Sequence, residues 1–316
     1  MKSLKKIFIT GYSGQLGFAI AQQLEKDPHL KVFCAIRKDQ IKTKNLESVY
    51  FDFTEKDSIY SAINTIKPDL CINCAAYTDV EQAESEKDLA TKVNVDGTKY
   101  LCDALKKIEC PIIHFSTDHV YNTSHENLIL ESEETNPINH YGKTKLEGEK
   151  LITQSSIDYL IYRTSWVYSL RGKNFLTTMI QLFQKKEEIS VVSDQWGAPT
   201  NTSTINALIL HNIKDSKYDF LSYISKHKGI YHICDAGETN WAHFAKKIKD
   251  NVRSVDKKKF IIQNIHEIKS HQYPSKAKRP YNSRLSLKKT QETFCFYAKH
   301  WQKNLEMSIK DNLFKV

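Results

Sequence analysis

The stretch KKIFITGYSGQLGFAIAQQL, residues 5–24, decides the fold that we expect for this chain of 316 residues. A β-branched, apolar run leads into a turn that contains Gly11, Gly14 and Gly17, and an amphipathic segment follows from Gln15 to Lys26. Glycines in such a turn let the chain bend sharply, let backbone N–H groups approach a pyrophosphate, and let helix pack on strand. The stretch therefore predicts a strand, a dinucleotide-binding turn and a helix. A glycine turn without a ligand is the alternative.

Short apolar runs and amphipathic segments continue to alternate through the first half of the chain. This alternation is typical of βαβ units with a parallel sheet. We therefore expect a doubly wound, Rossmann-like α/β domain whose ligands bind beyond the carboxyl ends of the strands. The expected strands are KKIFIT, KVFCAI, SVYFDFT, DLCINCAA, PIIHFST and DYLIYRTSWVY, and the expected helices span 15–26, 55–66, 86–107 and a segment from about Tyr141.

After about Tyr168 the alternation becomes irregular, which indicates a smaller, mixed α/β substrate domain. Further helices are expected over 174–186, 202–213 and 240–252, with strands at ISVV and GIYHIC. We assign residues 1–168 to the dinucleotide-binding domain, with roughly 201–236 returning to it. The substrate domain then comprises 169–200 and 237–316.

Composition and charge narrow the class of protein. Hydrophobic residues make up 40% and charged residues 26%, as in globular proteins. The apolar run near residue 7 is too short for a signal peptide, and no stretch approaches the ~18 apolar residues of a membrane span. A soluble, cytoplasmic protein is therefore expected, with no membrane partner.

The net charge of +9 is unevenly distributed, with 19 Lys and Arg against 23 Asp and Glu in residues 1–150 and 27 against 14 in residues 151–316. A basic second half favours an anionic partner. Since the sequence holds no RNA- or DNA-binding signature, we expect a phosphorylated small molecule and no nucleic acid.

The seven cysteines argue for a reducing compartment, because their number is odd and they are spread along the chain. Cys71 and Cys74 form a C-x-x-C pair within an expected buried strand. Residues three apart in a strand point to opposite faces, so we expect core cysteines rather than a metal or redox pair.

Arg37 and Lys38 follow the second expected strand, where NAD-preferring proteins of this fold usually carry an acid. Two cations there suit a 2′-phosphate, so we expect NADPH as the cofactor, and NADH is the alternative. Arg37 and Lys38 could instead be exposed loop charges without a ligand. Asp52, after the third strand, is expected to accept from an adenine amino group while Phe53 lines the pocket. The alternative is that Asp52 caps the helix near Glu55.

The fourth strand is followed by the small residues Ala75 and Ala76, which would let the backbone pass close to a nicotinamide; packing alone would also explain them. The fifth strand delivers Thr117 and Asp118 at its carboxyl end. These are the positions at which this fold class holds its ligands.

Tyr141 and Lys145 lie four residues apart in NHYGKTKLEGEK, residues 139–150, and so share one face of the expected helix. A nearby cation lowers the pKa of a phenol, which is ordinarily ~10. We expect Thr117 to bind a substrate carbonyl oxygen, Tyr141 to exchange its proton, and Lys145 to lower the tyrosine pKa and hold the ribose of the cofactor. A nicotinamide would supply the hydride. Lys143, Glu147 and Glu149 are expected to form the solvated, salt-bridged face of the helix.

These residues resemble the extended short-chain dehydrogenase/reductase superfamily, on GYSGQLG, NCAAYT, VNVDGT, FSTD and YGKTK. Within it the chain is similar to the dTDP-4-dehydrorhamnose reductase family, on IYRTSWVY, GKNFLTTMI, VVSDQWGAPT, GIYHI, AKRPYNSRL and the W-x-x-F-A motif at residues 241–245. The resemblance implies NADPH-dependent reduction of the C4 keto group of a nucleotide-linked 4-keto-6-deoxysugar, most simply dTDP-4-dehydro-L-rhamnose, for cell-surface polysaccharide.

Carried over residue by residue, the resemblance implies three groups of contacts. The pyrophosphate turn would be Gly14, Gln15 and Leu16. The adenine, ribose and nicotinamide contacts would be Asp52, Phe53, Ala76, Tyr77 and Thr78. The sugar contacts would be Val80, Thr117, Asp118 and Trp166, with Tyr141 as the catalytic acid; a core aromatic is the alternative for Trp166.

The chain departs from the family pattern in two places. His119 and the atypical loop over 119–134 follow the expected substrate contacts, which leaves the nucleobase and the sugar open. Some family members carry an acid for a metal-bridged dimer where this chain has Ala19, so we expect no metal, and monomer and homodimer both stay open.

Three other functions compete with reduction. A 4,6-dehydratase would carry an acid where this chain has His119, and a 4-epimerase would hold NAD tightly, against which Arg37 speaks. A non-catalytic, NADP-binding regulatory subunit would not need Thr117, Tyr141 and Lys145 together.

Overall fold

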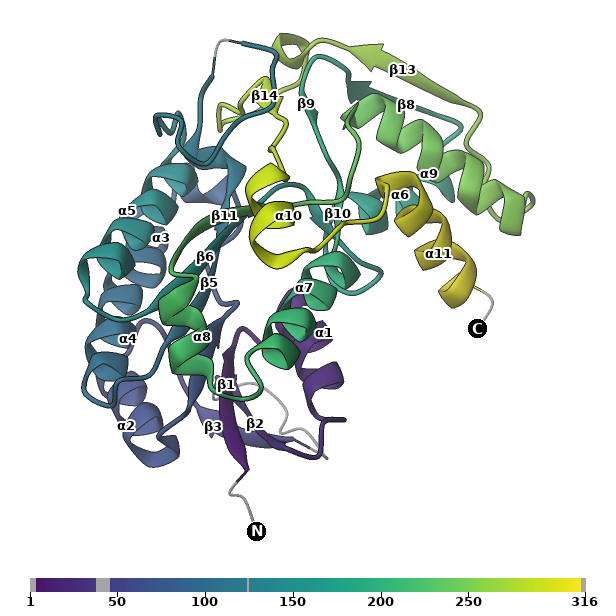
Figure 1. Ribbon diagram of the computed structural model, residues 1–316. Helices are drawn as coiled ribbons and strands as arrows, with labels where there is room; N and C mark the ends of the chain where they lie inside the picture. The colour runs from purple at the N-terminus through teal and green to yellow at the C-terminus, as the bar shows by residue number, and fades with distance from the viewer. Residues whose placement is uncertain (1–3, 38–45, 124, 314–316) are drawn as a thin grey trace.

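The computed structural model describes residues 4–37, 46–123 and 125–313. Its largest element is a seven-stranded parallel sheet in the order β11-β6-β5-β4-β1-β2-β3 (Figure 1). The strand order reverses between β1 and β4, and ligands bind at such a reversal in sheets of this kind. The strands are β1 (Lys5–Thr10), β2 (Leu30–Ile36), β3 (Glu47–Tyr50), β4 (Leu70–Asn73), β5 (Ile112–Thr117), β6 (Tyr159–Thr164) and β11 (Gly229–Ile233).

Helices cover both faces of the sheet, as the apolar faces of a parallel sheet require. Figure 1 shows α2, α4 and α5 on one face and α1, α7 and α8 on the other. Phe8 and Leu101 are fully buried in the first layer, and Ile9 and Leu208 are fully buried in the second. The helices are α1 (Gln15–Leu24), α2 (Lys56–Ile66), α4 (Gly97–Lys106), α5 (His140–Gln154), α7 (Thr202–Asp215) and α8 (Phe220–Lys226).

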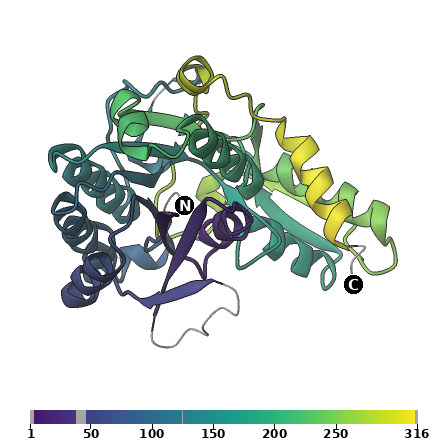
Figure 2. The same ribbon diagram turned by 60° about the horizontal axis from the view of Figure 1, so that its bottom comes forward.

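A smaller lobe has its own core, in which Phe183, Phe244 and Trp301 are fully buried. Figure 2 shows two of its helices, α9 and α11, to one side of the parallel sheet. None of the helices in the described part of the chain is long and apolar enough to cross a bilayer. The main elements of this lobe are α6 (Phe175–Phe183), α9 (Trp241–Val255), α11 (Trp301–Leu313) and the parallel strands β8 (Glu188–Val192) and β13 (Asn264–Ile268).

The described fold also contains short strands, 3-10 turns and a further short helix. They include β7 (Val167–Tyr168), β9 (Trp196–Gly197), β10 (Thr200–Asn201), β12 (Thr239–Asn240), β14 (Asn282–Ser283), the 3-10 turns η1 (Gln82–Glu84), η3 (Asp118–Val120) and η4 (Ser270–Gln272), and the helix α10 (Lys288–Phe294).

The structure confirms the α/β fold class and most of the expected elements, and it corrects two of them. The segment 86–107, expected as one helix, consists of α3 (Lys87–Thr91), the π-helical turn η2 (Lys92–Asp96) and α4. The run DYLIYRTSWVY, expected as one strand, is divided into β6 and β7 because Trp166 has a φ of 48°. A residue in this left-handed region cannot continue a strand.

The division into domains remains a proposal. Two contacts support the return of residues 201–236 to the first domain. β11 pairs with β6 at the edge of the main sheet, and α7 packs against α1.

Candidate active site

The turn between β1 and α1 brings three glycines to the edge where the strands end. Gly11 has a φ of 68°, which glycine adopts without strain. A Cβ atom on Gly17 would collide with the carbonyl group of Gly11, so the helix can lie this close to the turn only with glycine there. α1 begins after Gly14, which provides no side-chain cap, and its first turn holds no acidic side chain. A helix start of this kind favours an anion.

Gln15, the first residue of α1, is held by the smaller lobe. Its Oε1 atom accepts hydrogen bonds from Ser169 Oγ and from Asn174 Nδ2, each at 2.9 Å. Leu16 is half-buried and packs against the core below the turn. The segment between β7 and α6 therefore lies directly on the glycine turn.

Two arginines lie near the expected cofactor positions. The Arg171 guanidinium is 3.8 Å from the centre of the Phe18 ring on α1, and so places a cation beside the glycine turn. Arg37 directly follows β2 and is exposed, whereas Lys38 lies outside the described residues. The sequence had not singled out Arg171.

Asp52 and Phe53 follow β3 at the same edge of the sheet. Asp52 Oδ1 accepts from the backbone N–H and from the hydroxyl of Thr54, both at 2.8 Å. The alternative role of Asp52 as the cap of α2 is wrong, because Glu55 is the N-cap residue of that helix. Phe53 is buried in the core below α2 and α4.

The loop after β4 is fixed by Asn94 of η2. Asn94 Oδ1 accepts from the Tyr77 N–H at 2.8 Å, and its Nδ2 donates to the Tyr77 carbonyl at 3.1 Å and to Thr144 Oγ1 of α5 at 3.0 Å. The loop is therefore tied to the helix that carries Tyr141 and Lys145. Among its expected ligand contacts Thr78 is exposed, and the others are half-buried, namely Ala75, Ala76, Tyr77 and Val80.

Tyr141 and Thr117 come together at the carboxyl end of β5. The Thr117 hydroxyl lowers the pKa of the Tyr141 phenol, but burial outweighs it and raises that pKa above its usual value. The expected lowering of the tyrosine pKa by Lys145 is therefore wrong for the protein without ligands, because burial dominates. Thr117 Oγ1 also donates to Asp118 Oδ1 at 3.0 Å and accepts from the His119 N–H at 3.2 Å. Asp118 Oδ2 is buried and has no partner within the described residues. A buried oxygen without a partner is costly, and it marks a position where a ligand can donate.

Lys145 lies one turn after Tyr141 and is almost fully buried. Its Nζ atom is 3.2 Å from His114 Nε2 on β5, and burial lowers the pKa of its ammonium to about 8. One turn further along α5, Glu149 forms a buried ion pair with Arg163 of β6, with Nη2 and Oε2 2.6 Å apart.

The burial of Glu149 corrects the expected solvated face of α5. Lys143 and Glu147 are exposed as expected, but Glu149 points inward and its exposed fraction is 2%. Arg163 on the neighbouring strand supplies the partner that a buried carboxylate requires.

Trp166 is half-buried where β6 gives way to β7. Its ring stacks on that of Trp241 with centroids 3.7 Å apart and an interplanar angle of 15°. A Cβ on Gly197 would lie 2.9 Å from the Trp166 ring, so β9 also packs directly against this ring. This packing accounts for part of the role of Trp166, and its contact with a sugar stays a prediction.

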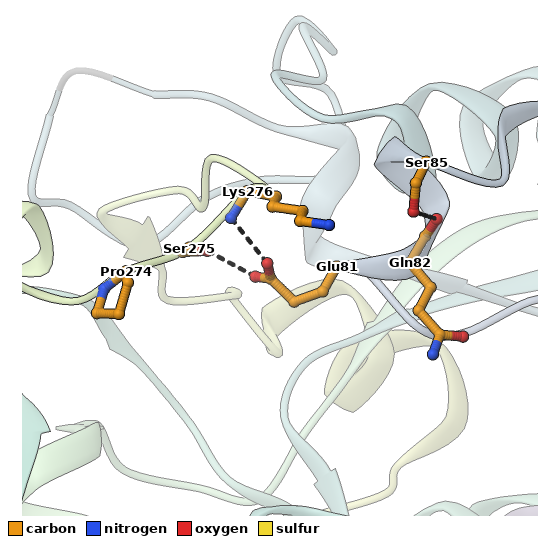
Figure 3. Close-up of a pocket in the computed structure, with 6 residues that line it drawn as sticks. All are labelled: Glu81, Gln82, Ser85, Pro274, Ser275 and Lys276. Carbon is orange, nitrogen blue, oxygen red and sulfur yellow. Dashed lines mark hydrogen bonds between the residues drawn. The ribbon is translucent and has the colours of Figure 1, made fainter.

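A segment of the smaller lobe, residues 274–279, is bound across the loop after β4. Glu81 accepts from Ser275 Oγ at 2.6 Å and from the Lys276 N–H at 2.8 Å, and it pairs with Arg279 at 2.6 Å. Figure 3 shows the contacts of Glu81 with Ser275 and Lys276 on the wall of a cleft of about 550 Å³, which Gln82, Ser85 and Pro274 also line. Asn139, the cap of α5, donates to the carbonyl of Lys278 at 2.8 Å. The segment thus joins the smaller lobe to the site.

Cys71 is buried in β4 and Cys74 is half-buried just after it, and both are free thiols whose pKa burial raises. Within the described residues, no group of three or more His, Cys, Asp or Glu side chains could hold a metal ion.

Comparison with known proteins places this site in a family. The family model described as RmlD substrate binding domain matches residues 5–314. The chain belongs to this family. It is 31% identical to a dTDP-4-dehydrorhamnose reductase of Escherichia coli K12, over 96% of this chain and 97% of that protein. It is 34% identical to the enzyme of that name from Aggregatibacter actinomycetemcomitans, over 96% and 98%.

Solved structures of this family share the fold. A dTDP-4-dehydrorhamnose reductase from Bacillus anthracis, in complex with NADP, superimposes with a TM-score of 0.82 at 30% identity, covering 98% of this chain and 99% of that one. One from Clostridium acetobutylicum gives 0.81 at 32% identity, covering 98% and 100%. The resemblance to the reductase family expected from the sequence is therefore confirmed.

Sequence reasoning missed several polar residues that hold the site together, namely Thr10 with its hydrogen-bond partner Asn73, Asn94, His114, Glu149, Arg163 and Arg171. A weak signal existed for His114, which is a polar residue within the apolar run PIIHFST. The others have partners distant in the sequence, so spacing along one element could not identify them.

We predict that Gly17→Ala destabilises the protein by about 1–3 kcal/mol, because the added methyl group meets a backbone carbonyl that cannot move aside. Gly14→Ala is the matched control, since a Cβ there lies 3.2 Å from the Gly11 carbonyl oxygen and Gly14 is exposed. Denaturant unfolding measures both. An equal decrease in the free energy of unfolding in the two variants would contradict the packing role of Gly17.

Proposed function

We propose that the protein reduces the C4 keto group of a nucleotide-linked 4-keto-6-deoxysugar with NADPH, as a dTDP-4-dehydrorhamnose reductase. The proximity of Tyr141 to Thr117, one turn from Lys145 and at the edge where the glycine turn lies, carries the proposal. Relatives at 31% and 34% identity bear that name over nearly their whole length. A spore coat polysaccharide biosynthesis protein of Bacillus subtilis, 30% identical, supports a role in polysaccharide synthesis.

The glycine turn fits the cofactor. The start of α1 is uncapped by a side chain and free of acidic groups in its first turn, as a pyrophosphate requires. Gly14, Gln15 and Leu16 would hold the pyrophosphate, Arg37 the 2′-phosphate and Asp52 the adenine. NADPH, when bound, supplies the hydride for the C4 carbon.

Tyr141 is suited to donate a proton. Because burial raises its pKa, the phenol keeps its proton over the physiological pH range and can protonate the C4 oxygen. The hydroxyl of Thr117 can donate to the same oxygen as its charge develops. Lys145 as an ammonium would stabilise the tyrosinate that remains.

The substrate would contact the groups around this pair. The unpartnered Asp118 Oδ2 can accept from a sugar hydroxyl. Val80 and the part of the Trp166 side chain that stays exposed would line the sugar position. His119, which begins the atypical part of the sequence, packs its ring edge-on against Tyr141, 5.5 Å between centroids, and would therefore lie close to the sugar.

The experiment that tests the function is a panel of 4-keto-6-deoxyhexoses linked to dTDP, UDP, GDP or CDP, followed by NADPH absorbance. Turnover of one or more members is expected, with dTDP preferred. NADPH binding without turnover across the panel would overturn the reductase assignment and favour a regulatory subunit. Oxidised NAD retained through purification would favour an epimerase.

Tyr141→Phe is expected to lower kcat by roughly 10²- to 10⁴-fold, because the proton donor is lost while the ring is kept. The free energy of unfolding should change little. Tyr297→Phe is the matched control, since Tyr297 is 73% exposed, and should retain full activity. A Tyr141→Phe enzyme with more than about half of the original kcat would remove the acid role from Tyr141.

Arg37→Glu is expected to raise the KM for NADPH by roughly tenfold to a hundredfold, because a charge-assisted hydrogen bond to the 2′-phosphate is lost and a like charge is introduced. The KM for NADH should stay within about twofold. The ratio of kcat/KM for the two cofactors measures this. Lys288→Glu, at a cation with 76% exposure, controls for the change in net charge. If Arg37→Glu leaves the ratio of kcat/KM for NADPH and NADH unchanged, Arg37 does not bind the 2′-phosphate.

A further inference from the structure

A chain of buried polar groups runs from the loop after β4 to Lys145. The Ala75 N–H donates to Thr10 Oγ1 at 3.2 Å, and Thr10 Oγ1 donates to Asn73 Oδ1 at 2.5 Å. Asn73 Nδ2 lies 2.9 Å from His114 Nδ1, and His114 Nε2 lies 3.2 Å from Lys145 Nζ. The four side chains come from β1, β4, β5 and α5, and each is at most 3% exposed.

The first member of this chain favours one direction of donation. Thr10 Oγ1 accepts from the Ala75 N–H and donates its own proton to Asn73 Oδ1, the arrangement in which the hydroxyl proton has a buried partner. The amide of Asn73 is thereby oriented with Nδ2 towards His114. Since Nδ2 can only donate, His114 Nδ1 is the acceptor, and a neutral imidazole then carries its proton on Nε2.

The Nε2–H of His114 faces Lys145 Nζ, and the two can hydrogen-bond only if the amine presents a lone pair. We propose that His114 is a positioning residue that favours the neutral amine of Lys145, through the one-directional chain of hydrogen bonds that begins at Ala75. The chain thereby moves the exchange between ammonium and amine at Lys145 towards neutral pH.

An ammonium at Lys145 requires the chain to reverse. His114 would have to carry its proton on Nδ1, and the Asn73 amide would have to turn over. Thr10 Oγ1 would then receive two donors, from Asn73 and from Ala75, and its own proton would lose Asn73 as acceptor. A buried donor left without a partner is unfavourable, so the reversed chain is the less stable one.

The charges around Lys145 are consistent with a neutral His114 and with a Lys145 pKa that lies close to neutral pH. The titratable or charged groups near Lys145 are His114 on β5, Glu149 on its own helix with Arg163 of β6, and Tyr141 with Asp118 beside it. Glu149 favours the ammonium, but burial outweighs it and lowers the Lys145 pKa to about 8. Burial and the neighbouring Lys145 hold the pKa of His114 well below its usual value, so His114 is neutral.

The consequence for turnover rests on the proposed reductase function. If the ammonium of Lys145 stabilises the tyrosinate of Tyr141, kcat falls as pH rises through the Lys145 pKa. If a variant lets the Lys145 ammonium donate a hydrogen bond to the side chain at position 114, the Lys145 pKa should rise. The fall in kcat should then move to higher pH. A merely structural role for His114 would lower kcat without moving the profile.

The tautomer of His114 tests the chain without reference to activity. Nitrogen NMR of the protein labelled at histidine, with His114 assigned from His114→Gln, should show the Nε2–H form above the pH at which Lys145 loses its proton. In Thr10→Val, where nothing orients Asn73, the Nδ1–H form should persist to higher pH. An Nδ1–H tautomer or an imidazolium in the unaltered protein at about pH 9.5 would overturn the proposal.

The pH profile of kcat tests the consequence, in His114→Gln, Thr10→Val and the double variant. The glutamine amide can turn its oxygen to the ammonium, so each single variant should move the fall in kcat up by roughly one pH unit. The double variant should move it no further than either, because both act through one chain. Thr290→Val, which removes another buried hydroxyl, should leave the profile unchanged.

The outcomes separate the two proposals. Absence of turnover in the unaltered enzyme refutes the proposed function and leaves the NMR result to decide on His114. Turnover with profiles that coincide in the unaltered enzyme and in a folded single variant overturns the role of His114. Additive shifts in the double variant would show that Thr10 and His114 act separately, which also overturns it.

Discussion

All seven strands of the main sheet run in the same direction, and this single constraint determines where the chemistry can take place. Each loop that follows a strand must emerge at the same edge, so residues distant in the sequence become neighbours there. The glycine turn follows β1, Asp52 follows β3, Asn73 ends β4 and Thr117 ends β5. The rest of the molecule covers the faces of this sheet or closes over this edge.

The position of α5 against the sheet is fixed by polar contacts as much as by apolar ones. Lys145, Glu149 and Thr144 all point inward and meet His114, Arg163 and Asn94. Breaking a buried ion pair by removing one partner costs about 3–5 kcal/mol, so a shift of the helix by even one residue would be strongly unfavourable. The same contacts that hold the helix therefore fix Tyr141 opposite Thr117.

The features that depend on one element were predictable from the sequence. A strand, a glycine turn and a helix occupy adjacent residues, and Tyr141 and Lys145 share a face because of helical spacing alone. Glu149 has the same spacing from Lys145, yet its burial depends on Arg163, which lies on another element and has no local signature. The left-handed Trp166 and the π-helical turn around Asn94 escaped prediction for the same reason, since both make contacts with residues distant in the sequence.

Gln15 gives the molecule a property that neither part would have alone. It begins the helix whose N-terminus receives an anion, yet its side chain is held by Ser169 and Asn174 of the smaller lobe. A ligand at the turn and a ligand against the smaller lobe therefore act on one shared contact. Thermodynamic linkage makes any coupling between the two ligands reciprocal, so a change in the affinity for one would require an equal change in the affinity for the other.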